Sequence, residues 1–190
     1  MTDAAQIILV HQLLFQGMFV AKNALLRRKL GQPIRGANPE ARAAIAFFAG
    51  FIALSLWLAV SGQPWGYLPV TSDGAAMWLS LPLLALNLWV GLASLRDLGD
   101  SWRVGVLEQQ QTALVHKGIY RYSRNPYFLS YLLMFAGYTV LLQNALLLAL
   151  SLPAFVLIHR MIRREERHLL GLHGEDFRRY CQRTPRYLLR

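Results

Sequence analysis

The stretch Thr112–Ser130, TALVHKGIYRYSRNPYFLS, organises the rest of the chain. It begins polar and basic, turns at Gly118 and ends apolar. Pro126 suits the first position of a helix, because the N–H that proline lacks would have no intrahelical acceptor there. The apolar run Pro126–Leu142 is long enough to enter a membrane. The sequence therefore places a basic loop, which carries Arg124, at the mouth of a membrane helix.

The composition favours a membrane protein. Hydrophobic residues make up 55% of the 190 residues, which is more than a soluble domain of this length carries. The 20 Lys and Arg residues fall into three blocks between the apolar runs, with six over 22–42, five over 96–124 and nine over 160–190. Such segregation is typical of the loops on one side of a membrane protein. We therefore expect a lipid bilayer as partner and no nucleic acid.

We expect an all-α integral membrane bundle that forms a single domain over residues 1–190. Its loops alternate between basic and uncharged, and basic loops stay in the cytoplasm. The N-terminus is thus expected outside and the C-terminus in the cytoplasm of a plasma membrane, or of the inner membrane in a bacterium. The five predicted spans are about 4–26, 43–60, 75–95, 126–142 and 145–161, with a cytoplasmic segment over 96–125 and a helical tail over 162–190.

Three polar residues fall inside these spans. Gln12 and Gln16 are four residues apart and share one helix face, which we expect to pack against other helices. Asn87 needs a hydrogen-bond partner within the membrane. We expect Asn87 to bond to a neighbouring helix rather than to a ligand.

An ordered set of short motifs runs through the second half of the chain: Leu114-Val115, Gly118, Tyr120, Arg124, Pro126, Glu165-Glu166 and GEDFRRY over Gly174–Tyr180. The set resembles the isoprenylcysteine carboxyl methyltransferase and phospholipid methyltransferase family, whose members are integral membrane enzymes that use S-adenosylmethionine. The resemblance begins near Leu98. The chain departs from the family pattern at Asn125, Phe128 and Ser130, where the family has His, Tyr and Gly.

Methyl transfer from a sulfonium is a direct displacement, which needs aligned atoms and exclusion of water. The residue types around the motifs suit a zwitterionic cofactor that carries adenine. Arg124, Asn125 and the N–H groups of the helix that follows are expected to hold its carboxylate. An apolar wall for adenine is expected at Leu114 and Val115, with Tyr120 to bond or stack.

Two adjacent glutamates follow the fifth span. Glu165 continues its apolar stripe and is expected to face the other helices. Glu166 points about 100° away, so we expect it near water or paired with Arg163 or Arg164. Cofactor binding should depend more on Glu165 than on Glu166.

The resemblance implies a cytoplasmic cofactor pocket and an arginine near the methyl acceptor, one turn before the first glutamate. That position is Met161, so Arg160 is expected to take the catalytic role beside Glu165. We expect no metal, because Cys181 is the single cysteine. The expected cofactor-binding residues are Thr112, Ala113, Leu114, Val115, Tyr120, Arg124, Asn125, Pro126, Tyr127, Phe128, Glu165 and Glu166.

The sequence thus predicts an S-adenosylmethionine-dependent membrane methyltransferase with a lipophilic or small acceptor: an isoprenylcysteine-type carboxylate, a thiol or a lipid amine. One alternative is an NADPH-dependent enzyme like the membrane sterol reductases, whose pattern has Asn after the Pro. Here Tyr127 follows Pro126, and the double glutamate favours methyl transfer. A second alternative is a non-enzymatic basic membrane protein, which leaves the clustered polar residues without a common reason.

Overall fold

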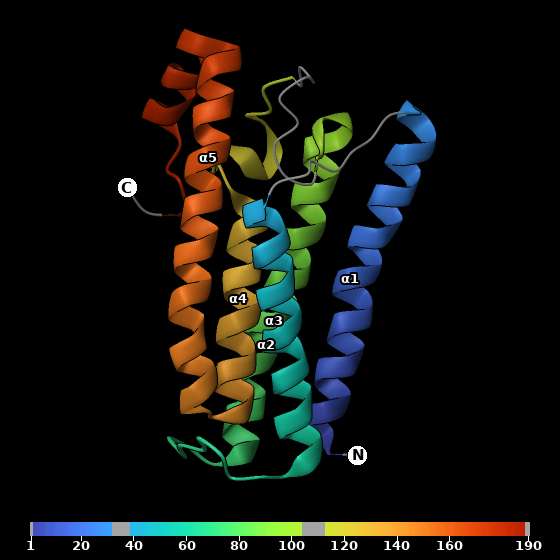
Figure 1. The fold of residues 1–190 in the computed structure, drawn as a ribbon, viewed down its shortest axis with the longest axis vertical. Coiled ribbons are helices and arrows are strands. Elements are labelled where there is room, and N and C mark those ends of the chain that lie inside the picture. Colours follow the sequence, from blue (N-terminus) through green and yellow to red (C-terminus); the bar gives the residue numbers. More distant parts are fainter. Residues whose placement is uncertain (1, 32–38, 104–112, 189–190) are drawn as a thin grey trace.

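The computed structural model describes residues 2–31, 39–103 and 113–188. Within them, five long helices run side by side as an antiparallel bundle (Figure 1). The all-α membrane bundle predicted from the sequence is confirmed. The helices are α1 (Asp3–Leu30), α2 (Pro39–Ser61), α3 (Asp73–Leu98), α4 (Pro126–Leu142) and α5 (Ala145–Arg183), with 3₁₀ helices η1 (Gly99–Ser101) and η2 (Gly118–Arg121) before α4.

Local sequence sets where the helices begin and end. The side-chain oxygens of Thr2, Ser72 and Asn144 accept N–H groups of the first turns of α1, α3 and α5, as N-cap residues do. Pro126 opens α4 in its first turn, as predicted. Gly31 ends α1 with a positive φ of 61°, a conformation that costs glycine little.

Three helices extend past the predicted spans, because a polar flank does not by itself stop a helix. The basic residues Arg27, Arg28 and Lys29 were expected in a loop but form the last turn of α1. Cations at that position face the negative end of the helix dipole, which stabilises the turn.

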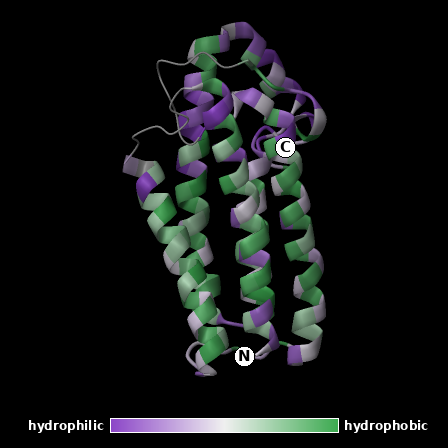
Figure 2. Ribbon diagram, turned by 90° about the vertical axis from the view of Figure 1, so that its right-hand side faces the viewer, coloured by the Kyte–Doolittle hydropathy of each residue, from purple (hydrophilic) through white to green (hydrophobic). Residues whose placement is uncertain are grey.

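An apolar band covers most of the height of the bundle, and polar residues gather at one end (Figure 2). Four of the described helices, α1, α2, α3 and α5, are long and apolar enough to cross a membrane. The shorter α4 has 17 apolar-rich residues and packs most extensively against α3. The protein is therefore multi-pass, and α5 continues beyond the apolar band.

The extension of α5 contains a sharp kink. Gly174 has φ 49° and ψ −117° inside the helix, a combination that favours glycine. The tail predicted as helical over 162–190 is helical as far as Arg183, with the kink at Gly174. The kink turns the last helical segment back over the polar end of the bundle (Figure 1).

The core is dense in aromatic rings and includes one buried amide. Phe135 of α4 packs edge-to-face on Phe48 and Phe51 of α2, with ring centroids 5.2 and 4.6 Å away. The amide of Asn87 donates to the Ser130 carbonyl at 2.6 Å. The predicted helix–helix hydrogen bond of Asn87 is therefore confirmed.

Hydrogen bonds tie the helices together at the end opposite the basic one. The Gln143 side chain, in the turn between α4 and α5, accepts the N–H groups of Val70 and Thr71 at 2.9 and 2.7 Å. The Thr2 hydroxyl donates to the Ala59 carbonyl at 2.7 Å, which links the start of α1 to α2. We name these contacts the outer staple.

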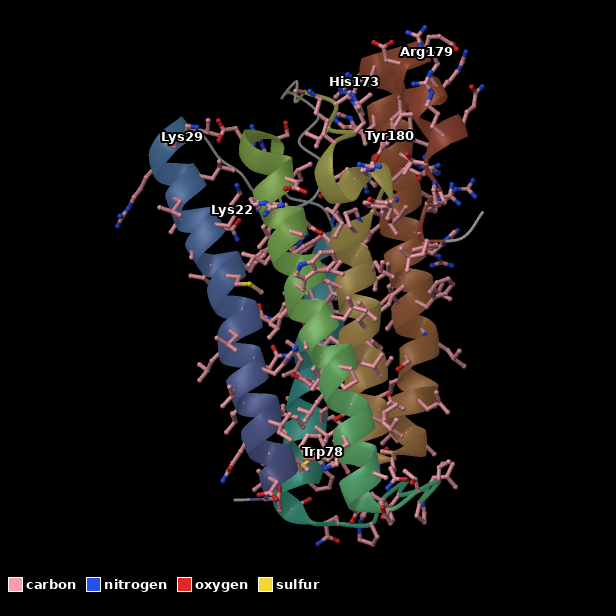
Figure 3. The ribbon with its side chains drawn as sticks, turned by 180° about the vertical axis from the view of Figure 1, so that it is seen from behind. Lys22, Lys29, Trp78, His173, Arg179 and Tyr180 are labelled. Atoms are coloured by element: carbon pink, nitrogen blue, oxygen red, sulfur yellow. The ribbon has the colours of Figure 1, made fainter. Side chains whose placement is uncertain are left out.

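The two termini lie toward opposite ends of the bundle (Figure 1). Figure 3 places Lys29 and Arg179 at one end and the exposed Trp78 toward the other. We name the described part of the stretch Thr112–Ser130, residues 113–130, the central motif. It begins at the end that carries Lys29 and Arg179, since Tyr180 of that end bonds to Tyr120.

Candidate active site

Gly118 allows η2 to sit against α3. It has φ 60°, and a Cβ atom there would lie 2.0 Å from Oδ2 of Asp97. The same Oδ2 accepts the N–H of Ile119 at 2.8 Å. Arg96 pairs with the other carboxylate oxygen, and these two contacts lower the pKa of Asp97. The turn predicted at Gly118 is confirmed. Its positive φ brings η2 close enough to α3 for Ile119 to bond to Asp97.

The end of α5 also holds η2 in place. The Tyr180 hydroxyl donates to the backbone carbonyl of Tyr120 at 2.6 Å. The Tyr120 side chain is buried at 6% exposure. Burial and the nearby Glu165 carboxylate raise its pKa well above the usual value, so its hydroxyl stays protonated at neutral pH. The GEDFRRY motif is thus brought against the central motif, 60 residues earlier in the chain.

Glu166 lies between two arginines, and the prediction that it would be solvated or paired with Arg163 or Arg164 is wrong. One carboxylate oxygen accepts from Arg124 at 2.8 Å and the other from Arg186 at 2.6 Å. These hydrogen bonds lower the pKa of Glu166. We name Arg124, Glu166 and Arg186 the arginine knot.

Arg124 has a structural position rather than the expected open one. Besides Glu166, its guanidinium donates to the carbonyls of Thr184 and Cys181 at 2.6 and 3.2 Å. Its own N–H donates to the Pro185 carbonyl at 3.0 Å. All three side-chain nitrogens of Arg124 therefore have acceptors within the protein.

The Asn125 side chain has a hydrogen-bond partner within the protein. Its side-chain amide donates to the Arg186 carbonyl at 3.2 Å, and it does not cap α4. The first backbone bond of the helix runs from Leu129 N–H to the Asn125 carbonyl. The N–H groups of Tyr127 and Phe128 therefore have no intrahelical acceptor, as the sequence predicted.

A cavity of about 740 Å³ opens beside these groups. The part of the cavity nearer the basic end, which we call its upper part, is lined by residues of the central motif and of α5. The structure brings most of the predicted residues to its wall: Ala113, Leu114, Val115, Tyr120, Arg124, Asn125, Tyr127, Phe128, Glu165 and Glu166.

The remaining predicted residues do not appear in the cavity wall as described. Thr112 lies outside the described residues. Pro126 is fully buried and opens α4 without lining the cavity. Arg160 is exposed and points away from the cavity, because five residues along a helix turn it about 140° from Glu165. Met161 and Arg164 line the wall instead, so the expectation for Arg160 is wrong.

The lower part of the cavity descends between α1, α2 and α4, and sequence reasoning missed it. Alanines of α2 leave the space, since Ala41, Ala44, Ala49 and Ala53 all line it. Their spacing of three to five residues was the available signal, because it places small side chains on one helix face. Aromatic side chains complete the wall: Phe48 of α2 itself, Phe19 of α1, and Phe128 and Tyr131 of α4.

Glu165 combines burial with access to the cavity. It lies beyond the apolar part of α5, in the cavity wall. Burial, with a smaller effect from Glu166, raises the pKa of Glu165 to about 7. A carboxyl group with this pKa exchanges a proton near neutral pH. Basic side chains complete the rim, because Arg103, Arg164 and His168 also line the cavity.

This geometry defines a membrane-embedded polytopic fold with a site at its basic end, and comparison with known proteins gives the class. The phospholipid methyltransferase family matches residues 75–176, which is more than half of the chain. The chain belongs to this family. The resemblance seen in the motifs is therefore confirmed, and the match weighs against the reductase and non-enzymatic alternatives.

A curated relative is more specific. The chain is 30% identical over 135 residues to a phosphatidylethanolamine N-methyltransferase of Paracoccidioides lutzii (strain ATCC MYA-826 / Pb01). The match covers 70% of this chain and 14% of the relative. The chain thus spans a small part of the length of the curated relative that it matches.

Proposed function

We propose that this protein methylates the amine of a membrane aminophospholipid, with S-adenosylmethionine as the methyl donor. The observation that carries the proposal is the single cavity that joins the motif-bearing polar end to an aromatic channel between membrane helices. A diacyl lipid needs such a shape, because its headgroup must reach a polar site while its chains stay in apolar surroundings. The relative's activity on phosphatidylethanolamine supports the choice of a lipid amine over a carboxylate or thiol.

The residues of the upper cavity fit the cofactor by type. The N–H groups of Tyr127 and Phe128 face the position where a helix dipole favours an anion, which suits the methionine carboxylate. Leu114 and Val115 offer an apolar wall to adenine. The buried, protonated Tyr120 offers a hydroxyl. When bound, the cofactor supplies an electrophilic methyl group on a sulfonium sulfur.

Glu165 is proposed to serve both cationic partners of the reaction. Its carboxylate attracts the sulfonium and the lipid ammonium, which share the cavity. An ammonium must lose its proton before nitrogen can attack, and a carboxylate with a pKa of about 7 is suited to accept it near neutral pH. With the cofactor bound, the nitrogen lone pair freed in this way could accept its methyl group, while Glu165 would keep the proton.

The basic rim is proposed to orient the lipid phosphate. Arg103 and Arg164 lie on the cavity wall, and guanidinium groups bind phosphate through paired hydrogen bonds. Arg124 is proposed to act through the fold, because its guanidinium donates to Glu166 and to the carbonyls of Thr184 and Cys181.

We also propose that the basic end faces the cytoplasm, with the N-terminus outside. The alternation of basic and uncharged loops supports this orientation. Lipid at that face would be methylated where cytoplasmic cofactor reaches it.

Methyl transfer in reconstituted vesicles tests the proposal. Purified protein with methyl-labelled S-adenosylmethionine should convert phosphatidylethanolamine to its N-methyl derivatives, detected by mass spectrometry, and should leave phosphatidylglycerol unchanged. Calorimetry should show binding of S-adenosylmethionine and none of NADPH. Transfer to a prenylcysteine carboxylate and not to the amine would refute the proposed acceptor, whereas binding of NADPH alone would refute the methyltransferase reading.

A further inference from the structure

Two glutamine side chains lie in the otherwise apolar lower part of the cavity. Gln12 and Gln16 of α1 both line it, although the sequence predicted that they would only pack against other helices. The amide of Gln16 donates to the Gln12 carbonyl oxygen at 3.2 Å, and the amide of Gln12 donates to the Tyr138 hydroxyl at 2.8 Å. An amide among apolar walls is costly unless it finds partners.

Hydrogen bonding deeper in the bundle fixes the orientation of these amides. The Asn87 amide nitrogen donates to the Ser130 carbonyl, so its oxygen faces His11 Nε2 at 2.9 Å and accepts a hydrogen bond from it. The other ring nitrogen of neutral His11 must then accept the Tyr138 hydroxyl at 2.8 Å. Tyr138 can consequently only accept from Gln12.

The result is a chain of hydrogen bonds with one direction. It begins at Gln16 in the cavity and passes through Gln12, Tyr138 and His11 to Asn87. Every inner member is buried or half-buried. The described bond uses one of the two N–H groups of Gln16, so its second N–H and its carbonyl oxygen remain for a ligand. This series of hydrogen bonds fixes the position of the Gln16 side chain.

The depth of Gln16 can be compared with that of the polar site. Phe19 stacks on Tyr127, and Phe15 packs edge-to-face on Tyr131. These contacts set α1 and α4 in antiparallel register, with Gln16 near the level of residue 130. That level is about 6 Å below the start of α4 at Pro126, since a helix rises 1.5 Å per residue.

We propose that Gln16, supported by Gln12, binds an acyl ester carbonyl of the diacyl lipid acceptor. The inference rests on the proposed function. Phosphate and glycerol separate the ester groups of such a lipid from its amine, so the esters lie deeper in the membrane by a distance of this order. An ester carbonyl is an uncharged acceptor that an amide N–H satisfies at low cost. Gln16 is therefore a specificity residue that distinguishes ester-linked from ether-linked lipids.

Paired lipids test this assignment. Wild-type protein is given phosphatidylethanolamine with ester-linked chains and its diether analogue of equal chain length. We expect kcat/KM to be roughly three- to tenfold higher for the ester lipid, as for one neutral hydrogen bond. Gln16→Leu should remove this preference and leave S-adenosylmethionine affinity unchanged. The control is Gln6→Leu, because Gln6 is exposed near the start of α1. This variant should keep the preference for the ester lipid.

The outcomes separate the two proposals. Equal kcat/KM for the two lipids in the wild type, or a full ester preference in Gln16→Leu, overturns the role of Gln16 and leaves the methyltransferase proposal standing. Wild-type protein that methylates neither lipid refutes the proposed function and the inference with it. If Gln16→Leu fails to fold, Gln16→Met provides the same comparison with a flexible apolar side chain.

Discussion

Arg124 and Glu166 are 42 residues apart in the chain, yet Nε and Nη2 of Arg124 both donate to Oε1 of Glu166, at 3.0 and 2.8 Å. The pair joins the loop before α4 to the extension of α5, and Arg186 closes it from the C-terminal segment. The polar end of the bundle is therefore held by a charge cluster that is largely shielded from water, with about a tenth of each paired side chain exposed.

Glu166→Gln should destabilise this end of the protein. Removing one partner leaves two arginines without a counter-charge, at a cost on the order of 3 kcal/mol. The single cysteine provides a local probe, because the Cys181 carbonyl accepts from Arg124. We expect faster maleimide labelling of Cys181 and a lower thermal midpoint. Glu175→Gln, at an exposed pair with Arg178, should change neither; an unchanged labelling rate in Glu166→Gln would contradict the structural role.

Acid should loosen the same cluster. The folded-state pKa of Glu166 is lowered by its arginine partners, so its stabilising contribution is present above the ordinary glutamate pKa. It is lost as the pH falls through the lowered value. The maleimide labelling rate of Cys181 in folded protein, corrected for the thiolate fraction at each pH, should therefore rise in acid. Glu166→Gln should show no such rise.

Glu165→Gln should act on the reaction instead. Loss of the charge removes one charge-assisted contact, which weakens S-adenosylmethionine binding roughly ten- to a hundredfold. In the wild type, kcat/KM should rise with pH through about 7, as the Glu165 carboxyl loses its proton. The variant should lack this rise while its thermal midpoint stays close to that of the wild type. An unaltered pH profile would exclude Glu165 as the base.

Two arginines of α5 allow a matched comparison. Arg164 lines the cavity, whereas Arg160 is exposed away from it. Arg164→Gln should lower kcat/KM for the lipid roughly ten- to a hundredfold, if it binds phosphate as proposed. Arg160→Gln should have little effect on the same measurement. The reverse order would restore the role that the sequence suggested for Arg160.

Gly118→Ala should disrupt η2. The added methyl group would meet Asp97 Oδ2 at 2.0 Å, and φ there is 60°, so we expect a loss of roughly 1–3 kcal/mol or more. Gly171→Ala is the control, because its Cβ meets nothing within 4 Å and alanine favours a helix by about 0.5–1 kcal/mol. Thermal unfolding of both variants checks the contrast.

The sequence predicted the elements whose cause is local. Pro126 opens α4 and Gln143 ends it as expected, and Gly118 marks the turn. The site was predictable in its residue types, because the motifs converge on one cavity. The partner of Arg124 was not, because no local pattern couples positions so distant.

The cavity itself required tertiary packing to be seen. The alanine face of α2 signals only that small side chains share one side. Whether another helix fills that space depends on the larger residues of α1 and α4. The path of the chain after Gly174 was likewise hidden, since one glycine changes the direction of the helix.

The outer staple fixes the spacing of the helices at the end of the bundle opposite the basic end. Thr2, Ala59, Gln143 and the loop of Val70 bind the helix ends together on one side, while the cavity lies among α1, α2 and α4 toward the other. Any widening that admits a lipid is therefore greatest at the basic end. Under the proposed function, substrate and product would exchange with one leaflet alone, and the enzyme would make the two halves of its own membrane chemically unequal.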